Sequence, residues 1–398
     1  MNTGCGNILY TFHRCCYRSL ATSKHLPDAS RKYAVWTENQ SPFSNLKYNN
    51  VGGVTSLTFD AGLSQFRNTH CDVDTKKDIL CRGYEDKAKS HLSEGLPIIH
   101  HVKYVSEFPI KHRFCMRKFH AVFRYLRMDQ VISVKQVVEP WEVSQEECEL
   151  VHSKDYIHKV FTGLTSDREQ RVSGFKWSPG IISRCRYEAG GTILACHLAL
   201  ERGVACSTGG GTHHAFFSHG SGYCLINDMA IAAASIIASG RVDRVLIVDL
   251  DVHQGDGTAS LLQLRDDIFT LSFHCGSNFP FTKQNSDLDI SLKDHINDDE
   301  YLSELEDVLP YVVDTFRPDL VIYDAGVDPH KDDELGRLDL TDDGLYRRDK
   351  YVIDHLAIQG IPVATVIGGG YSRSLNILGR RHTIVHRAAS QVWREREL

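Results

Sequence analysis

Three polar residues near the middle of the chain have the types and the spacing of a metal site. Residues 249–253 read Asp-Leu-Asp-Val-His, so Asp249, Asp251 and His253 alternate along a predicted strand end. Alternate residues of an extended strand point to the same side, and a strand cannot bury so many polar groups without partners. A divalent cation would compensate them, because aspartate oxygen and histidine nitrogen are both zinc ligands.

A further ligand should come from another strand end, and Asp328 in the segment DAGVD is the natural candidate. Two carboxylates and one imidazole would leave one coordination position open for water, as catalytic zinc sites do. An isolated Asp-x-His usually has no function, but here it accompanies a second strand-end aspartate and a histidine pair. The sequence therefore predicts a catalytic zinc site.

The histidine pair follows a glycine run, in the stretch GGGTHH at 209–214. Glycines let the backbone approach a ligand closely. Zinc bound by two carboxylates acidifies its water only weakly, so a nearby base must take the proton. One of His213 and His214 could be that base and the other could hold charge and orientation. Each needs a carboxylate to set its tautomer, and Asp249 and Asp256 are the spare acids. A Walker-type phosphate loop is excluded, because no Lys-Ser/Thr follows the glycines.

A tyrosine completes the set of candidates. Tyr371 follows Gly368–Gly370 at a predicted strand end. Its hydroxyl could donate a hydrogen bond to an oxyanion that forms beside the metal. A tyrosine after glycines is more often a packing residue, so its interest depends on the other clusters.

Predicted strands and helices alternate along this part of the chain. Strands are predicted over 203–207, 244–253, 267–274, 319–326 and 361–371, and helices over 119–128, 181–201, 228–239, 299–316 and 341–359. This alternation predicts a doubly wound parallel sheet. Functional residues of such sheets collect at the carboxyl ends of the strands, where all four clusters lie.

Composition limits the class of protein. The 398 residues fit one large α/β domain with an extension. A net charge of -6 argues against broad nucleic-acid binding through a basic surface. No run of 18 apolar residues occurs, so we expect no membrane span. The 12 cysteines form no CxxC pairs, which predicts free thiols in a reducing compartment.

The first residues differ from the rest of the chain. Residues 1–32 contain a single acid, Asp28, and carry Arg14, Arg18, Lys24, Arg31 and Lys32. This composition is typical of an organellar transit peptide, and a plain disordered tail fits it equally well. Residues 33–95 are polar and lack periodicity, which predicts a linker or loose extension. The predicted domains are an N-terminal extension over 1–95, a catalytic domain over 96–390 and a short tail over 391–398.

The motifs together resemble those of the zinc-dependent histone deacetylases, which have the arginase/deacetylase fold. The resemblance covers residues 96–390 and rests on five motifs in order: GGGTHHA, GYCLIND, DLDVHQGDGT, DAGVD and GGGY. It is closest to the class IV branch and its bacterial relatives. It implies a single large domain with a mainly parallel, eight-stranded, doubly wound sheet flanked by helices.

The resemblance implies two metal sites. Asp251, His253 and Asp328 would bind one zinc ion per subunit. The family also binds a structural potassium ion near the residues that correspond to Asp249 and Ser272, and this sequence keeps both residue types.

The resemblance also implies catalytic roles. His214 would act as general base and then as general acid, with His213 as its electrostatic partner. Asp249 and Asp256 would orient the two histidines. Tyr371 would polarise the substrate carbonyl and stabilise the tetrahedral oxyanion.

A third set of residues would form the acyl-lysine tunnel. Tyr223 stands where the family has an aromatic wall, and Gly222 would leave room for the acyl chain. Phe279 or Phe281 would supply the opposite ring. Leu335, seven residues after the second metal aspartate, replaces the acidic gatekeeper of polyamine-specific relatives, which disfavours an acetylpolyamine substrate.

The implied activity is hydrolysis of a linear amide: deacetylation of N6-acetyl-lysine in proteins, or removal of a longer acyl group. The family is associated with histones, corepressor complexes and the regulation of chromatin and transcription, whereas the sequence itself identifies neither a substrate protein nor an oligomeric state. We expect neither direct nucleic-acid contact nor a membrane span. The family implies a nucleus or cytoplasm location, and a transit peptide would imply a mitochondrion or plastid.

Two other functions use the same fold. An arginase-like ureohydrolase, one kind of small-molecule amidohydrolase, needs further carboxylates for a second metal, but Gln254-Gly255 and Pro329-His330 occupy those positions. A non-catalytic scaffold in a repressor complex would usually have lost a ligand, a histidine or the tyrosine, and all are present. His330 could approach the rim of the metal site, but a solvent-facing position in a loop is the expected one.

Overall fold

A single mixed sheet organises the part of the chain that the computed structural model describes, residues 10–12, 83–91 and 95–398. Its strands are β1 (Tyr10–Phe12), β2 (Ile98–Ile99), β3 (Val137–Val138), β4 (Val204–Ser207), β5 (Val245–Asp249), β6 (Ile268–Cys275), β7 (Leu288–Leu292), β8 (Leu320–Asp324) and β9 (Val363–Val366). They lie in the order β1-β7-β6-β5-β8-β9-β4-β2-β3. Strands β2 to β9 pair in parallel, and β1 pairs antiparallel with β7 at the edge. The predicted eight-stranded parallel sheet is confirmed.

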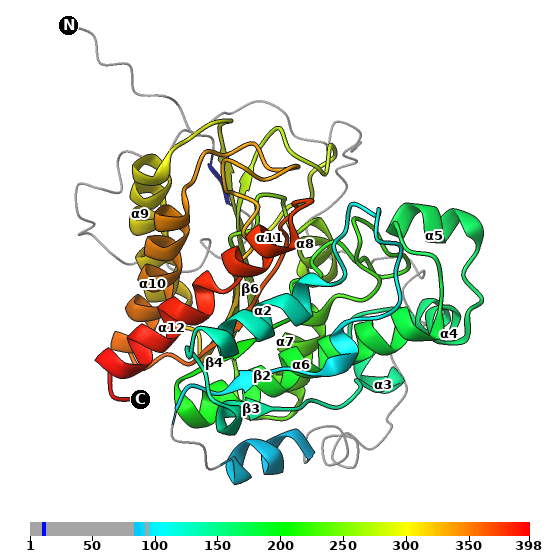
Figure 1. Cartoon of the computed structure of the whole chain (residues 1–398), viewed down its shortest axis with the longest axis horizontal. Helices are drawn as coiled ribbons and strands as arrows, with labels where there is room; N and C mark the ends of the chain where they lie inside the picture. The colour runs from blue at the N-terminus through cyan, green and yellow to red at the C-terminus, as the bar shows by residue number, and fades with distance from the viewer. Residues whose placement is uncertain (1–9, 13–82, 92–94) are drawn as a thin grey trace, which may run out of the picture. The chain divides into compact units, whose positions relative to one another are not determined.

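Helices cover the sheet. They are η3 (Val102–Tyr104), α2 (Lys118–Met128), η4 (Val134–Gln136), α3 (Gln145–Cys148), α4 (Lys154–Thr162), α5 (Asp167–Ser173), α6 (Pro179–Arg202), α7 (Asp228–Ala238), α8 (Asp256–Leu262), α9 (Asp298–Phe316), α10 (Asp342–Ile358), α11 (Leu375–Arg381) and α12 (Ile384–Glu395). Figure 1 shows α9, α10 and α12 grouped together and α6 beside α7. None of the described helices is long and apolar enough to cross a membrane.

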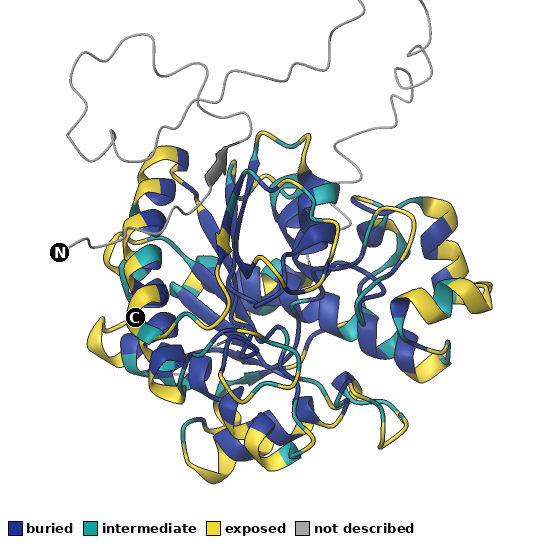
Figure 2. Ribbon diagram, turned by 90° about the horizontal axis from the view of Figure 1, so that it is seen from above, coloured by how far each residue is buried: buried dark blue, intermediate teal, exposed yellow. Residues whose placement is uncertain are grey.

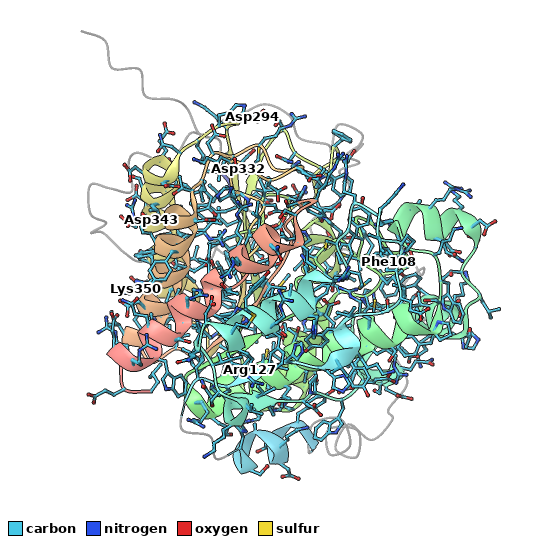
Figure 3. All side chains as sticks on the ribbon, in the orientation of Figure 1. Phe108, Arg127, Asp294, Asp332, Asp343 and Lys350 are labelled. Carbon is cyan, nitrogen blue, oxygen red and sulfur yellow. The ribbon has the colours of Figure 1, made fainter. Side chains whose placement is uncertain are left out.

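Burial follows the strand composition. Every residue of β5, β6 and β8 is buried, as expected for continuous apolar runs that are covered on both faces. Figure 2 shows this buried centre, with exposed residues on the outer sides of the helices. Loops that follow β7 and β8 lie at one end of the sheet, where Asp294 and Asp332 are labelled in Figure 3.

Two predicted strands are too long. β5 ends at Asp249, so the predicted extended strand through His253 is wrong. The backbone N–H of Asp251 donates to Asp249 Oδ1 (3.1 Å) and that of His253 donates to Asp251 Oδ1 (2.9 Å). These local side-chain bonds replace the strand ladder. β9 likewise ends at Val366, before the glycine run.

The ends of the chain add two observations. Most of the predicted extension over 1–95, including most of the candidate transit peptide at 1–32, lies outside the described residues, so its nature stays a prediction. Within the described segment 83–91, Tyr84 and Ala88 are buried in the core of the sheet domain. Helix α12 continues past residue 390, the predicted end of the catalytic domain.

Candidate active site

Three buried side chains converge at the carboxyl ends of two neighbouring strands, β5 and β8. They are Asp251, His253 and Asp328, and their ligand atoms all lie within 4.8 Å of one another. His253 Nδ1 lies 2.9 Å from Asp251 Oδ1 and 3.2 Å from Asp328 Oδ2. Apart from this contact with His253, the buried Asp328 Oδ2 has no hydrogen-bond partner among the described residues. Two oxygens and one nitrogen around one point suit a divalent cation such as zinc.

Backbone groups hold the two carboxylates. Gly369 N–H donates to Asp251 Oδ2 (2.7 Å), and Val252 N–H donates to Asp328 Oδ1 (2.8 Å). A Cβ atom at Gly369 would lie 2.2 Å from Asp328 Oδ2 and 2.5 Å from Asp251 Oδ2. Only glycine fits so close to both acids, which explains one glycine of the GGGY motif.

The loop after β4 brings the two histidines to the same place. His213 Nδ1 lies 2.8 Å from Asp249 Oδ2, and His214 Nδ1 lies 2.6 Å from Asp256 Oδ1. Asp249 is the last residue of β5, and Asp256 begins α8. The structure therefore pairs each histidine with one of the two spare acids.

The two rings differ in electrostatics. Burial opposes the charged form of His213, but the carboxylates of Asp249 and Asp251 outweigh it and raise its pKa well above the usual value. Burial, and next the neighbouring His213, lower the pKa of His214 to about 4 despite its bond to Asp256. His214 is therefore neutral near pH 7, with Nε2 as the nitrogen available to accept a proton.

Tyr371 lies beside the metal-ligand candidates. Its side chain is buried, and its ring centroid is 6.1 Å from that of His253. Its backbone N–H donates to Asp333 Oδ2 (2.7 Å). Burial, and next the charge of Asp328, raise the pKa of Tyr371 well above its usual value, so the hydroxyl keeps its proton.

Of the predicted tunnel residues, Gly222, Tyr223 and Phe279 lie beside the site, whereas Phe281 does not. Gly222 (φ +52°) lies against His214: a Cβ atom there would lie 2.4 Å from His214 Cδ2. The Tyr223 ring lies 6.1 Å from that of Tyr371. Phe279 lies 4.9 Å from the His214 ring, whereas Phe281 is 90% exposed and contacts Phe279 at 6.5 Å. The geometry therefore favours Phe279 as the opposite ring.

The other predicted residues lie nearby. Leu335 packs partly buried against the core, and its carbonyl accepts a hydrogen bond from Asn278 Nδ2 (2.7 Å). Asp249 and Ser272, the potassium candidates, are register partners on β5 and β6.

His330 is not solvent-facing, so that expectation was wrong. It is 3% exposed. Its Nε2 lies 3.3 Å from Asp342 Oδ1, and its Nδ1 accepts the backbone N–H of Asp332 (2.9 Å). These polar partners allow the ring to be buried in a loop.

The sequence did not single out several charged residues behind the histidines. A small cavity of about 30 Å³ is lined by both histidines and by Lys118, Arg184 and Glu188. Lys118 Nζ donates to the carbonyl of Gly368 (2.9 Å), and Arg184 pairs with Glu188 (2.8 Å). Arg184 and Glu188 are charges within the predicted helix 181–201, and Lys118 directly precedes the predicted helix 119–128.

Asp324 is another buried charged residue that the sequence did not single out, although it begins the DAGVD motif. It forms a second buried group with His213 and Asp249. Neither of its carboxylate oxygens has a hydrogen-bond partner in the described part of the chain. Burial, and next the charge of Asp249, raise its pKa well above the usual value.

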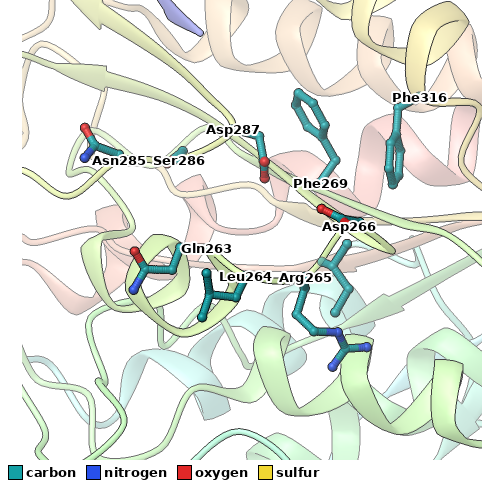
Figure 4. Close-up of a pocket in the computed structure, with 10 residues that line it drawn as sticks. Gln263, Leu264, Arg265, Asp266, Phe269, Asn285, Ser286, Asp287 and Phe316 are labelled. Carbon is teal, nitrogen blue, oxygen red and sulfur yellow. The ribbon is translucent and has the colours of Figure 1, made fainter. Parts of the chain in front are cut away.

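A separate hollow of about 210 Å³ lies near the amino-terminal end of β6, between residues 263–269, residues 285–287 and Phe316 (Figure 4). None of the residues that line this hollow was predicted to be a site residue. It lies away from the carboxyl ends of the strands, so it gives no support to the predicted chemistry.

Comparison with known proteins agrees with this geometry. A family model described as the histone deacetylase domain matches residues 112–387. An uncharacterized protein of Picosynechococcus sp. is 47% identical over 299 residues, which cover 75% of this chain and 100% of the relative. Histone deacetylase 2 of Arabidopsis thaliana is 32% identical over 272 residues, covering 66% of this chain and 70% of that protein.

A solved structure supports the fold. The crystal structure of the HDA15 HD domain matches with a TM-score of 0.62 and 22% identity, over 76% of this chain and 92% of that chain. Family model, relatives and fold agree, and the chain therefore belongs to the histone deacetylase family, with a deacetylase-type hydrolase domain.

Proposed function

We propose that the chain is a zinc-dependent lysine deacylase that hydrolyses the linear amide of N6-acetyl-lysine, or of a longer acyl-lysine, in proteins. One observation carries this proposal. The histidine of a buried Asp-His-Asp group lies within ring-contact distance of both a neutral histidine and a tyrosine.

Asp251, His253 and Asp328 would hold the zinc ion, because their donor atoms converge and one carboxylate oxygen has no other partner among the described residues. When bound, the ion would supply Lewis-acid polarisation of the amide carbonyl and a lower pKa for a water molecule. A structural potassium ion at Asp249 and Ser272 is part of the proposal and rests on the family resemblance.

The protein side chains would move the protons. His214 Nδ1 is bonded to Asp256, so Nε2 would take the proton from the attacking water and return it to the leaving lysine amine. Asp256 stabilises the imidazolium that forms between these steps. The Tyr371 hydroxyl, protonated in its buried position, would donate a hydrogen bond to the developing oxyanion.

The aromatic residues would guide the substrate. Tyr223 and Phe279 would line the path of the lysine side chain, because they contact Tyr371 and His214 respectively. Gly222 leaves space beside the base.

A deacylation panel on the purified protein tests the proposal. Lysine peptides with acetyl and myristoyl groups, and unmodified controls, are incubated with and without a zinc chelator. We expect chelator-sensitive release of the acyl group. Bound zinc without release would favour a small-molecule amide or a partner-dependent enzyme, and neither zinc nor release would favour a scaffold in a repressor complex.

Class IV membership, histone substrates, corepressor partners and transcriptional regulation belong to the same proposal and rest on the family resemblance. Location in the nucleus or cytoplasm is the family expectation. A fluorescent reporter that carries residues 1–95 tests the alternative, because import into a mitochondrion or plastid would support a transit peptide and a diffuse signal would support a plain tail.

A further inference from the structure

A fully buried arginine lies behind the candidate metal site. Arg348, on α10, has a side-chain exposure of 0%. Its Nη1 donates to the carbonyl of Leu250 (3.1 Å) and to that of Gly326 (2.9 Å). Burying a guanidinium costs free energy unless its charge and its N–H donors have partners, so the partners of Arg348 indicate what its burial achieves.

The two carbonyls belong to the loops that carry the metal-ligand candidates. Leu250 directly precedes Asp251, and Gly326 lies two residues before Asp328. One nitrogen atom therefore joins the two loops immediately before their ligands.

The contacts of Arg348 with the two carbonyls continue the pairing of β5 and β8 beyond the ends of these strands. The parallel ladder of β5 and β8 ends at Asp249 and Asp324, and the next bond runs from Leu250 N–H to the Asp324 carbonyl (3.1 Å). Beyond that point the chains leave the strand geometry. The guanidinium of Arg348 then bridges them in place of backbone pairing.

The charge of the arginine is neutralised on its other side. Arg348 Nε donates to Asp349 Oδ1 (2.9 Å), and Nη2 lies 2.8 Å from the same oxygen. The Tyr323 hydroxyl also donates to Asp349 Oδ1 (2.6 Å). Asp349 thus neutralises the guanidinium on one side, while Nη1 is directed at the two carbonyls on the other.

The loops are close enough for a small shift to matter. A Cβ atom at Gly326 would lie 2.5 Å from Asp251 Oδ2. The position of Gly326 therefore limits where the Asp251 carboxylate can lie. We propose that Arg348 is a positioning residue that fixes the separation of the two metal-binding loops and thereby sets the affinity for the metal. This inference rests on the proposed function.

Two substitutions separate positioning from general stability. Arg348→Lys keeps a positive charge beside Asp349. It loses the planar guanidinium, which binds the Asp349 carboxylate and the two loop carbonyls at the same time. Asp349→Asn keeps both bonds to the loops and weakens only the ion pair. We expect both variants to be less stable to heat. Because outer-shell groups change metal affinity by about 10- to 100-fold, we expect that loss for Arg348→Lys and less than about 3-fold for Asp349→Asn.

The measurement is the dissociation constant for zinc alone, from competition with a chelator, on full-length wild type and both variants. The visible spectrum of the cobalt-loaded proteins is a second readout, expected to change in Arg348→Lys only. Wild-type zinc affinity and an unchanged cobalt spectrum in Arg348→Lys would overturn the inference. The inference would also fail if both variants lost zinc affinity in proportion to their loss of thermal stability. Wild type that binds no zinc would overturn the proposed function as well, and measuring it first distinguishes the two failures.

Discussion

Two histidine–aspartate pairs lie side by side in the site and have opposite electrostatics. Both rings are buried, and each bonds a carboxylate through Nδ1, at 2.8 Å for His213 and 2.6 Å for His214. His213 has the carboxylates of Asp249, Asp251 and Asp324 around it, which raise its pKa. His214 has Asp256 and two neighbouring imidazoles, and its pKa is lowered to about 4. The number of nearby carboxylates, rather than the paired acid alone, decides which ring stays neutral.

The largest effect should come from removing the neutral ring. His214→Ala is expected to lower kcat by about 10²- to 10⁴-fold, the range for a lost general base, with zinc still bound. His213→Ala should lose less, because its ring takes no proton from water. Steady-state kinetics and zinc content of both variants check this. Equal losses would mean that the two rings share the proton transfer.

The second test removes one carboxylate from each pair. Asp256→Asn is expected to lower kcat by about 10- to 100-fold, as for other groups that orient a site residue, because His214 has no other carboxylate partner to stabilise its imidazolium. Asp249→Asn should cost less, because Asp251 and Asp324 still face His213. The ratio of the two kcat values is the measurement, and a larger loss in Asp249→Asn would contradict the comparison.

The substrate should meet the His214 side of the site. Phe279→Ala is expected to raise KM by roughly 10-fold, the effect of losing about 1.5 kcal/mol of apolar contact. Phe281→Ala is the matched control in the same loop. Its ring is 90% exposed, so KM should change by less than about 2-fold. Similar KM values in the two variants would rule out Phe279 as a tunnel wall.

A third histidine–aspartate pair, His330 with Asp342, lies outside the site and should matter only for stability. The hydrogen bond from His330, with Arg381 as a further partner, lowers the pKa of Asp342 to about 2. The pKa of an aspartate in the unfolded chain is about 3.9, so the lower pKa of Asp342 in the folded protein stabilises the fold above about pH 3.9. This contribution is lost as the pH falls towards 2. Asp342→Asn should therefore lose less stability than wild type on acidification. The difference should stay below about 1 kcal/mol, because Asp342 is mostly exposed and water screens the pair. Chemical denaturation at pH 5 and pH 2.5 measures it, and identical acid dependence would contradict it.

The sequence predicted the central strands and long helices because their patterns are local. The run at 245–248 is apolar and mostly β-branched, and α6, α9 and α10 are marked by periodicity and caps. The two-residue strands β2 and β3 have no such pattern. The true end of β5 depends on bonds from aspartate side chains to the backbone, and a strand pattern does not reveal these.

The candidate site was predicted through motifs, and its supporting residues were not. Asp251, His253 and Asp328 stand in short stretches whose composition is unusual in itself. Lys118 and Arg348 are single charges within otherwise ordinary helices. What distinguishes them is complete burial and their contact with carbonyls from distant loops, and these depend on tertiary packing rather than on spacing.

The loops that meet at the metal-ligand candidates also constrain how the chain can fold. Val252 and Asp328, which bond across the site, are 76 positions apart in the chain. Contacts of such sequence separation form only after a large loop has been closed, and they are slow to form. We therefore expect the metal-binding geometry to form late in folding. An ion would be captured only when β5 and β8 have already paired, so uptake of metal would report the final assembly of the sheet centre.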